Sequence, residues 1–164
     1  MEIRHIKQTD DRFAISHIYE ESWKYAYKDI IPQSYLKSIP TGHWIPNLDK
    51  AGMNTLVLIE NDTFIGTSGY CKSRFSDFDS FGEIVSIYFL PQYMGKGYGK
   101  QLLDAAINEL TKLGYRDIFL WVLEENHRAR KFYEKAGFVL SDNYLDDNIG
   151  GKELREIQYC YHVE

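Results

Sequence analysis

Apolar and polar positions recur along the chain with two different periods, and the changes of period predict its strands and helices. Residues 2–6 are expected to form a short strand, and apolar positions over about 10–28 recur at helical spacing. Proline suits a first helical position, so Pro32 is expected to open a short helix that reaches residue 36. Residues 41–52 show no clear period and are expected to be irregular or helical.

The middle of the chain predicts a hairpin followed by alternating strands and helices. TLVLIE (55–60) and TFIGTSGY (63–70) are separated only by Asn61-Asp62, which is typical of a tight two-residue turn. The remaining expected elements are a strand over 83–90, a helix over 97–113, a strand over 117–123, a helix from Asn126 to Gly137, and a strand over 154–163.

These elements predict an α/β chain with a mixed sheet. The strand–helix–strand unit over 83–123 implies a parallel pair, because a crossover helix returns the chain to the same end of the sheet. The hairpin over 55–70 implies antiparallel neighbours. At 164 residues, the chain is expected to form one domain over residues 1–164.

Composition and charge exclude several classes of protein. No apolar run approaches the roughly 20 residues of a membrane-spanning helix, and the N-terminus lacks a signal-peptide pattern. The net charge is −5, which argues against a nucleic-acid partner. Cys71 and Cys160 stand alone and the five histidines show no ligand spacing, so we expect a cytoplasmic protein with free thiols and no metal.

The stretch PQYMGKGYGKQLL (91–103) places three glycines, at 95, 97 and 99, between a predicted strand and a predicted helix. Unpaired N–H groups and the helix dipole make such a place attractive to anions, and glycine allows a phosphate to approach the backbone closely. Lys96 and Lys100 add positive charge. The pattern favours a phosphate cradle, and the alternative is a glycine-rich turn packed against the sheet.

The spacing identifies the kind of cradle. A Walker A loop is excluded because position 94 is Met and position 101 is Gln, and neither glycine pair completes a dinucleotide GxGxxG motif. The pattern Gln92-x-x-Gly95-x-Gly97 resembles the pyrophosphate loop of the GNAT superfamily of acyl-CoA N-acyltransferases. A second segment, WVLEENHRARKFYEKAGF (121–138), resembles the family's other hallmark.

The resemblance implies a GNAT-like fold, with a mixed, mostly antiparallel sheet, a splayed parallel strand pair and about four flanking helices. It implies acetyl-CoA as co-substrate and no metal. The pantetheine arm is then expected along the strand edge at 87–89, with an N–H near Phe89 facing the thioester oxygen. The residues that the resemblance implies for CoA binding are Ile87, Tyr88, Phe89, Gln92, Gly95, Lys96, Gly97, Tyr98, Gly99, Lys100 and Asn126.

The implied reaction is attack of a primary amine on the thioester, for which the protonated amine must first lose a proton. Glu83 resembles the glutamate that many members carry on this strand and is the candidate base; the alternative is a solvated carboxylate at a strand end. Glu124 and Glu125, which follow the next strand, are the substitutes.

Tyr133 is the candidate acid for the leaving thiolate. It lies seven residues after Asn126, on the same helical face, with the small Ala129 between them. By pattern alone, Tyr133 also fits a helical core stripe.

The acceptor is expected to be a small, cationic amine. The aromatic residues Trp23 and Tyr27 offer cation–π attraction, and an acidic segment over 141–153 carries Asp142, Asp146 and Asp147. This segment is expected to be a loop beside the acceptor or a solvated turn. The alternatives are a protein or peptide amine as acceptor, a CoA-binding sensor without turnover, and a nucleotide-binding protein. A homodimer is the assembly considered.

Overall fold

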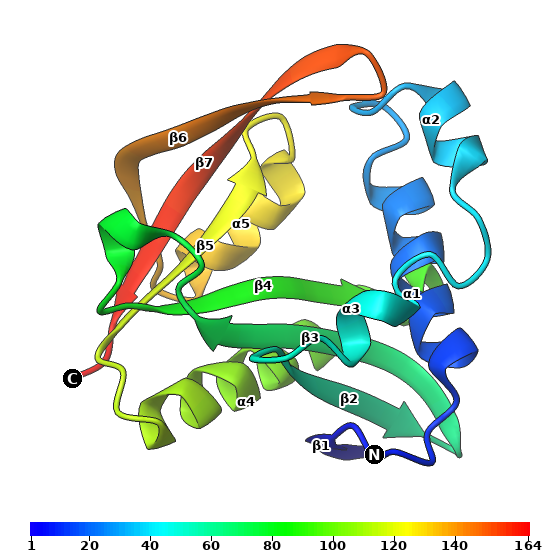
Figure 1. The fold of residues 1–164 in the computed structure, drawn as a ribbon, viewed down its shortest axis with the longest axis horizontal. Helices are drawn as coiled ribbons and strands as arrows, with labels where there is room; N and C mark the ends of the chain where they lie inside the picture. The colour runs from blue at the N-terminus through cyan, green and yellow to red at the C-terminus, as the bar shows by residue number, and fades with distance from the viewer.

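One seven-stranded sheet runs through the computed structural model, which describes residues 1–164 (Figure 1). The strand order is β1-β2-β3-β4-β5-β7-β6, and every neighbouring pair is antiparallel except β4 and β5. The strands are β1 (Glu2–His5), β2 (Asn54–Glu60), β3 (Thr63–Lys72), β4 (Gly82–Phe89), β5 (Asp117–Leu123), β6 (Val139–Ile149) and β7 (Lys152–His162). The expected mixed sheet with one parallel pair is confirmed.

Five α-helices accompany the sheet: α1 (Arg12–Ala26), α2 (Gln33–Ser38), α3 (Ile45–Leu48), α4 (Tyr98–Lys112) and α5 (His127–Lys135). About four were expected. The additional one, α3, is a single turn inside the segment that was expected to be irregular or helical. No helix of the chain combines the length and apolar character that crossing a membrane requires.

The side chains that alternate along β2 show that α1 and α4 pack on opposite faces of the sheet. Leu56 and Leu58 belong to the core cluster that contains the buried leucines of α4, whereas Val57 packs with Ile15 and Tyr19 of α1. Successive side chains of a strand point to opposite faces, so the two helices cover opposite sides. The sheet is therefore a rigid support with an apolar layer on each face.

The β2–β3 hairpin confirms the predicted two-residue turn. Asn61 and Asp62 have φ values of 49° and 60°. Positive φ at both central positions defines the turn that suits the twist of a hairpin, and Asn and Asp tolerate it better than most residues.

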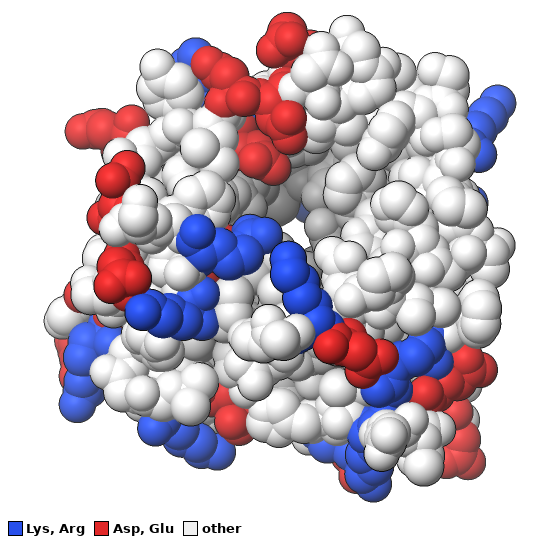
Figure 2. Space-filling view, in the orientation of Figure 1, with Lys and Arg blue, Asp and Glu red and all other residues white.

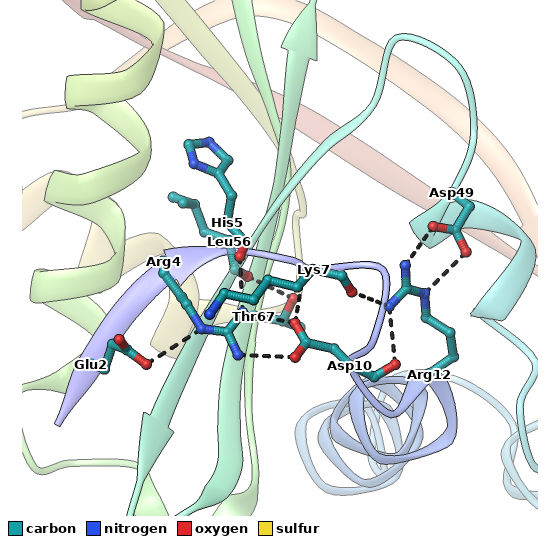
Figure 3. A network of polar contacts seen from close by, with 9 residues as sticks. All are labelled: Glu2, Arg4, His5, Lys7, Asp10, Arg12, Asp49, Leu56 and Thr67. Carbon is teal, nitrogen blue, oxygen red and sulfur yellow. Dashed lines mark hydrogen bonds and ion pairs between the residues drawn. The ribbon is translucent and has the colours of Figure 1, made fainter.

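Two arginine–aspartate pairs anchor the region where α1 begins, one to β1 and one to the residue after α3 (Figure 3). Arg4 donates to both carboxylate oxygens of Asp10, at 2.8 and 2.9 Å, and Arg12 donates to both oxygens of Asp49, at 3.0 and 2.8 Å. Such two-point contacts fix orientation as well as distance. They fix where α1 begins, and α1 forms one wall of the cavity described below.

The expectation of a loop over 141–153 is wrong, because most of this segment belongs to β6. Residues 139–149 pair with β7 at the edge of the sheet, and Val139, Leu140 and Tyr144 are largely exposed. The apolar residues of this edge strand do not alternate regularly with polar ones, so the usual signal of a strand was missing. The tip of the β6–β7 hairpin reaches the α1–α2 connection, where Lys152 donates to the carbonyl of Ile30 at 2.9 Å (Figure 1).

The parallel pair separates soon after it begins. Only Gly82 and Glu83 of β4 pair with β5, opposite Ile118 and Phe119. Beyond this point β4 continues to Phe89 and β5 to Leu123 without pairing to each other. The splayed strand pair implied by the resemblance is therefore present.

Candidate active site

A cavity of about 1060 Å³ occupies the opening between β4 and β5. Its walls come from α1, β4, the loop before α4, β5, α5 and the β6–β7 hairpin. Figure 2, drawn in the orientation of Figure 1, shows a hollow near the centre of the molecule, with acidic side chains gathered above it and basic side chains along its lower edge. Most of its lining is apolar, so the few polar groups that reach it are the candidates for chemistry.

Six successive backbone N–H groups at one end of this cavity have no acceptor in the protein. They run from Gly95 to Lys100, across the start of α4. Gly95 and Gly97 adopt φ values of 77° and 84°, which residues with a Cβ seldom adopt, and an added Cβ at either would meet nothing within 4 Å. The loop is therefore open toward solvent and able to surround an anion at the positive end of a helix.

Gly99 serves a different purpose from the other two glycines. Its φ is ordinary, but a Cβ there would lie 3.2 Å from the ring of Phe132 on α5. The third glycine thus lets α4 and α5 approach each other at the end of the cavity.

The edge of β4 that faces β5 is free of a neighbouring strand from Ile84 to Phe89. A bulge on the other side, between β4 and β3, leaves Val85 without a partner, because Gly69 pairs with Ser86 and Tyr70 with Ile84. Bulges bend a strand and increase its twist, which agrees with the separation of β4 from β5. An extended ligand with amide groups fits such an edge as an added strand does.

Most of the residues predicted to bind CoA line this cavity: Ile87, Tyr88, Phe89, Gly95, Gly97, Gly99, Lys100 and Asn126. Three others do not. Gln92 is exposed in a short 3₁₀ turn, Lys96 lies over the ring of Tyr93 at 5.5 Å, and the Tyr98 hydroxyl donates to Glu60 at 2.7 Å. The side chains of these three are thus directed elsewhere, although Lys96 and Tyr98 still contribute free N–H groups.

Asn126 caps α5, as expected for a residue before a helix. Its side-chain oxygen accepts from the N–H of Ala129 at 3.3 Å, and both residues line the cavity. The amide nitrogen has no partner in the protein and is available to a ligand.

Glu83 lies at the wall of the cavity but is fully buried, so the alternative of a solvated strand-end carboxylate is wrong. Arg74 holds it: the guanidinium approaches Oε2 at 2.7 Å, and the Arg74 backbone N–H donates to Oε1 at 3.1 Å. The Arg74 side chain is 48% exposed. Both carboxylate oxygens are therefore occupied by one neighbour. Glu124 and Glu125 are exposed and lie outside this cavity.

Tyr133 lies in both of the environments expected for it, the aromatic core and the wall of the cavity. Its ring packs against Phe132 and Phe138, with centroids 5.3 and 5.8 Å apart, whereas its hydroxyl has no hydrogen-bond partner and the residue lines the cavity. Burial, with a smaller influence from Tyr88, raises the pKa of this hydroxyl well above its ordinary value. It therefore stays protonated at neutral pH.

The aromatic residues predicted near the acceptor are close to each other. Trp23 and Tyr27 line the cavity with ring centroids 5.0 Å apart in an edge-to-face contact. Burial raises the pKa values of Tyr27 and Tyr88, which adds two protonated hydroxyls to this wall.

The acidic residues of the β6 segment are not all free. Asp146 accepts from Arg155 at 2.9 Å, and with Glu124, Glu125 and Glu153 it lines a separate hollow of about 380 Å³. Asp142 and Asp147 are exposed. These charges lie outside the main cavity and give the surrounding surface a negative potential.

The sequence analysis missed several charged residues that line the cavity, and Arg74 and Glu156 are among them. Arg74 precedes a strand in a polar segment, and Glu156 belongs to a strand whose pattern predicted only structure. Neither belongs to the motifs that carried the family resemblance, so only the fold brings them to the site.

Both cysteines are free thiols, as expected. Cys71 is buried, which raises the pKa of its thiol to about 11. The structure brings together no group of three or more His, Cys, Asp or Glu side chains that could hold a metal ion.

Comparison with known proteins supplies a family match. The model of the acetyltransferase (GNAT) family matches residues 13–138. The [ribosomal protein bS18]-alanine N-acetyltransferase of Haemophilus influenzae is 38% identical over 109 residues, which cover 65% of this chain and 70% of that protein. The spermidine N(1)-acetyltransferase of Thermoplasma acidophilum is 27% identical over 164 residues, covering 93% and 97%.

A solved structure supports the fold. The PaiA N-acetyltransferase of Thermoplasma acidophilum, crystallised in complex with coenzyme A, matches with a TM-score of 0.75 at 23% identity, over 98% of this chain and 100% of that one. At this identity the likeness establishes the overall fold alone.

Proposed function

The chain belongs to the GNAT acetyltransferase family, and we propose that it transfers acetyl to the primary amine of a small, cationic acceptor. It is an acyl-CoA-dependent N-acetyltransferase whose co-substrate is acetyl-CoA. The nature of the acceptor, the roles of the individual site residues, a cytoplasmic location and a homodimer are predictions.

The free N–H groups of the Gly95–Lys100 loop carry the proposal for CoA binding. The pyrophosphate is held there, with the charge of Lys100 near by, and the pantetheine amides pair with the open edge at 87–89. The Asn126 side chain lines the same cavity and offers its amide nitrogen. Bound acetyl-CoA supplies a thioester carbon that an amine can attack directly.

Glu83 is proposed as the base that takes a proton from the acceptor's ammonium group, directly or through a water molecule. Its carboxylate is buried beside the cavity, where a charge interacts strongly with its surroundings. Arg74 donates to both oxygens, so the incoming proton uses a remaining lone pair on one of them.

Tyr133 is proposed as the acid that protonates the leaving thiolate. Its hydroxyl has no partner to restrain it, and its raised pKa keeps it protonated until a thiolate forms beside it. An ordinary thiol has a pKa of about 8.5, so a thiolate is a weaker base than the phenolate of this tyrosine. The Tyr133 hydroxyl therefore donates a hydrogen bond that stabilises the thiolate as the C–S bond breaks, and full transfer of its proton requires that the phenolate regain a proton, which the reacting amine supplies.

A cationic acceptor fits the charge and the walls of the site. The acidic surface above the hollow and the net charge of −5 favour approach of an ammonium group. Trp23 and Tyr27 present aromatic rings to it. The similar spermidine N(1)-acetyltransferase, by its name, acts on such an amine.

The second candidate is a peptide N-terminus. It is favoured by the 38% identity to a ribosomal-protein alanine acetyltransferase, although that match spans 65% of the chain. Discrimination between the two depends on the acceptor side of the cavity, which lies outside the shared motifs.

The experiment is an acceptor panel with acetyl-CoA, read by the free thiol released. Spermidine, 1,4-diaminobutane, a peptide with N-terminal alanine, and glutamate are compared by kcat/KM. The proposal expects spermidine or the diamine to be best and glutamate to be poorest. A peptide as best acceptor supports the second candidate. Binding of acetyl-CoA without thiol release from any amine would identify a sensor.

A further inference from the structure

Glu156 brings a second carboxylate to the lining of the cavity, from a different strand than Glu83. It lies on β7, where it is paired with Leu123 of β5 and Leu145 of β6, and all three residues line the cavity. Glu83 comes from β4. The two carboxylates therefore line the same cavity from different strands.

The two carboxylates differ in their partners. Arg74 occupies both oxygens of Glu83, whereas the side chain of Glu156 makes no hydrogen bond or ion pair within the protein. Burial, with a smaller contribution from Asp147, raises the pKa of Glu156, and Arg74 opposes this shift. A partly buried carboxylate without a partner is costly in free energy, and a cation that enters the cavity would relieve that cost.

Glu156 shares the cavity with Tyr27 and with the tyrosine proposed to act on the thiolate. Burial raises the pKa of Tyr27, and both Tyr133 and Glu156 are close enough to contribute to the shift. Tyr133 is influenced by Tyr88 but not by Glu156. Tyr27 is therefore near both of the other residues, and all three line the cavity that an acceptor would enter.

We infer that Glu156 selects acceptors with a second positive charge, by binding the ammonium group at the end that is not acetylated. This rests on the proposed function and names its substrate class as linear diamines and polyamines. The aromatic wall of Trp23 and Tyr27 covers the alkyl chain between the two nitrogens. A peptide N-terminus or a simple monoamine gains nothing from this contact.

The test compares 1,4-diaminobutane with butylamine, which has the same chain and lacks the second ammonium group. The wild type is expected to have a KM for the diamine roughly 10–100-fold below that for butylamine, as is typical of a hydrogen bond between charged groups. Glu156→Gln keeps the shape and removes the charge. It is expected to raise the KM of the diamine by this factor, to leave the KM of butylamine nearly unchanged, and to change neither kcat nor acetyl-CoA affinity more than a few-fold.

Glu153→Gln is the matched control, because it makes the same change of charge on the same strand but outside the main cavity. It is expected to behave as the wild type. If Glu156→Gln keeps the wild-type preference for the diamine, the inference is wrong. It is also wrong if both glutamine variants weaken this preference equally, because the preference would then come from the negative charge of the surface as a whole.

Failure of the proposed function is distinguishable. If the wild type acetylates no small amine, binding of 1,4-diaminobutane is measured directly by calorimetry. Binding to the wild type that Glu156→Gln removes supports the inference although the acceptor is another molecule. Absence of binding to the wild type overturns it.

Discussion

Replacing Gly97 by alanine tests the phosphate cradle with little disturbance elsewhere. Gly97 has a φ of 84°, and an added Cβ would meet no protein atom within 4 Å. The substitution therefore creates backbone strain without a clash, at a cost of about 1–2 kcal/mol in the free energy of unfolding. For a chain of this size, that lowers the melting temperature by about 2–8 °C. The protein stays folded.

Binding of acetyl-CoA is expected to suffer more than stability. The Cβ occupies the open side of the loop, where the N–H groups from Gly95 to Lys100 have no acceptor in the protein. Loss of one hydrogen bond to a charged phosphate is worth about 1.5–3 kcal/mol, which is roughly a 10–100-fold increase in Kd. Calorimetric titration of acetyl-CoA measures this change directly.

Gly114→Ala provides the control from the other end of the same helix. Gly114 has a φ of 100° and the same empty surroundings, so its substitution carries a similar strain. The two variants are expected to lose similar stability, while only Gly97→Ala loses affinity. Equal acetyl-CoA affinity in the two variants would refute the assignment of the loop.

Further variants test the proposed catalytic residues and the N-terminal contacts. Tyr133→Phe is expected to lower turnover by roughly 10–10³-fold with an unchanged Kd for acetyl-CoA, and unchanged turnover would leave Tyr133 a packing role only. Glu83→Gln is expected to slow the reaction most near neutral pH and to recover partly at high pH, where the amine deprotonates unaided; a uniform loss at every pH would indicate a structural role. Arg74→Met should lower the free energy of unfolding by about 2–3 kcal/mol in urea titrations. This loss is smaller than for a fully buried ion pair, because half of the Arg74 side chain is exposed. An unchanged free energy of unfolding would mean that the Arg74–Glu83 pair contributes nothing to stability. Hydrogen bonding to Arg4 lowers the pKa of Asp10 below its ordinary 3.8, so its contribution is present above that value and is lost as pH falls through the lowered pKa. Asp10→Asn is therefore expected to be less stable than the wild type at neutral pH and equally stable in strong acid, and a difference that persists in acid would contradict this.

Local patterns predicted most of the fold. The apolar run over 117–123 and the Asn61-Asp62 turn carried their structural signals within a few residues, so β5 and the hairpin were placed correctly. The edge strand β6 lacked such a signal, because its apolar residues do not alternate regularly and it pairs only with β7. Its position depends on backbone pairing with a distant segment, which a local pattern does not reveal.

The cavity was predictable where motifs line it and unpredictable elsewhere. Gly95 and Gly97 are glycines at a predicted strand–helix junction, and glycine at such a place indicates a positive φ, which both residues have. The burial of Glu83 by Arg74 required the β3–β4 connection to fold back, and Glu156 reaches the cavity only because β7 pairs beside β5. Both features arise from tertiary contacts, and both change the electrostatics of the acceptor side.

Hydrogen–deuterium exchange with and without acetyl-CoA tests the central claim most directly, namely that acetyl-CoA binds in the opening between β4 and β5. The N–H groups of the loop before α4 lack acceptors, and the edge of β4 that faces β5 has no neighbouring strand beyond Glu83. Acetyl-CoA is therefore expected to slow exchange in peptides that cover residues 84–101 and to leave the far end of α4, at 112–116, unchanged. Unchanged exchange over 84–101, with protection elsewhere, would contradict the account.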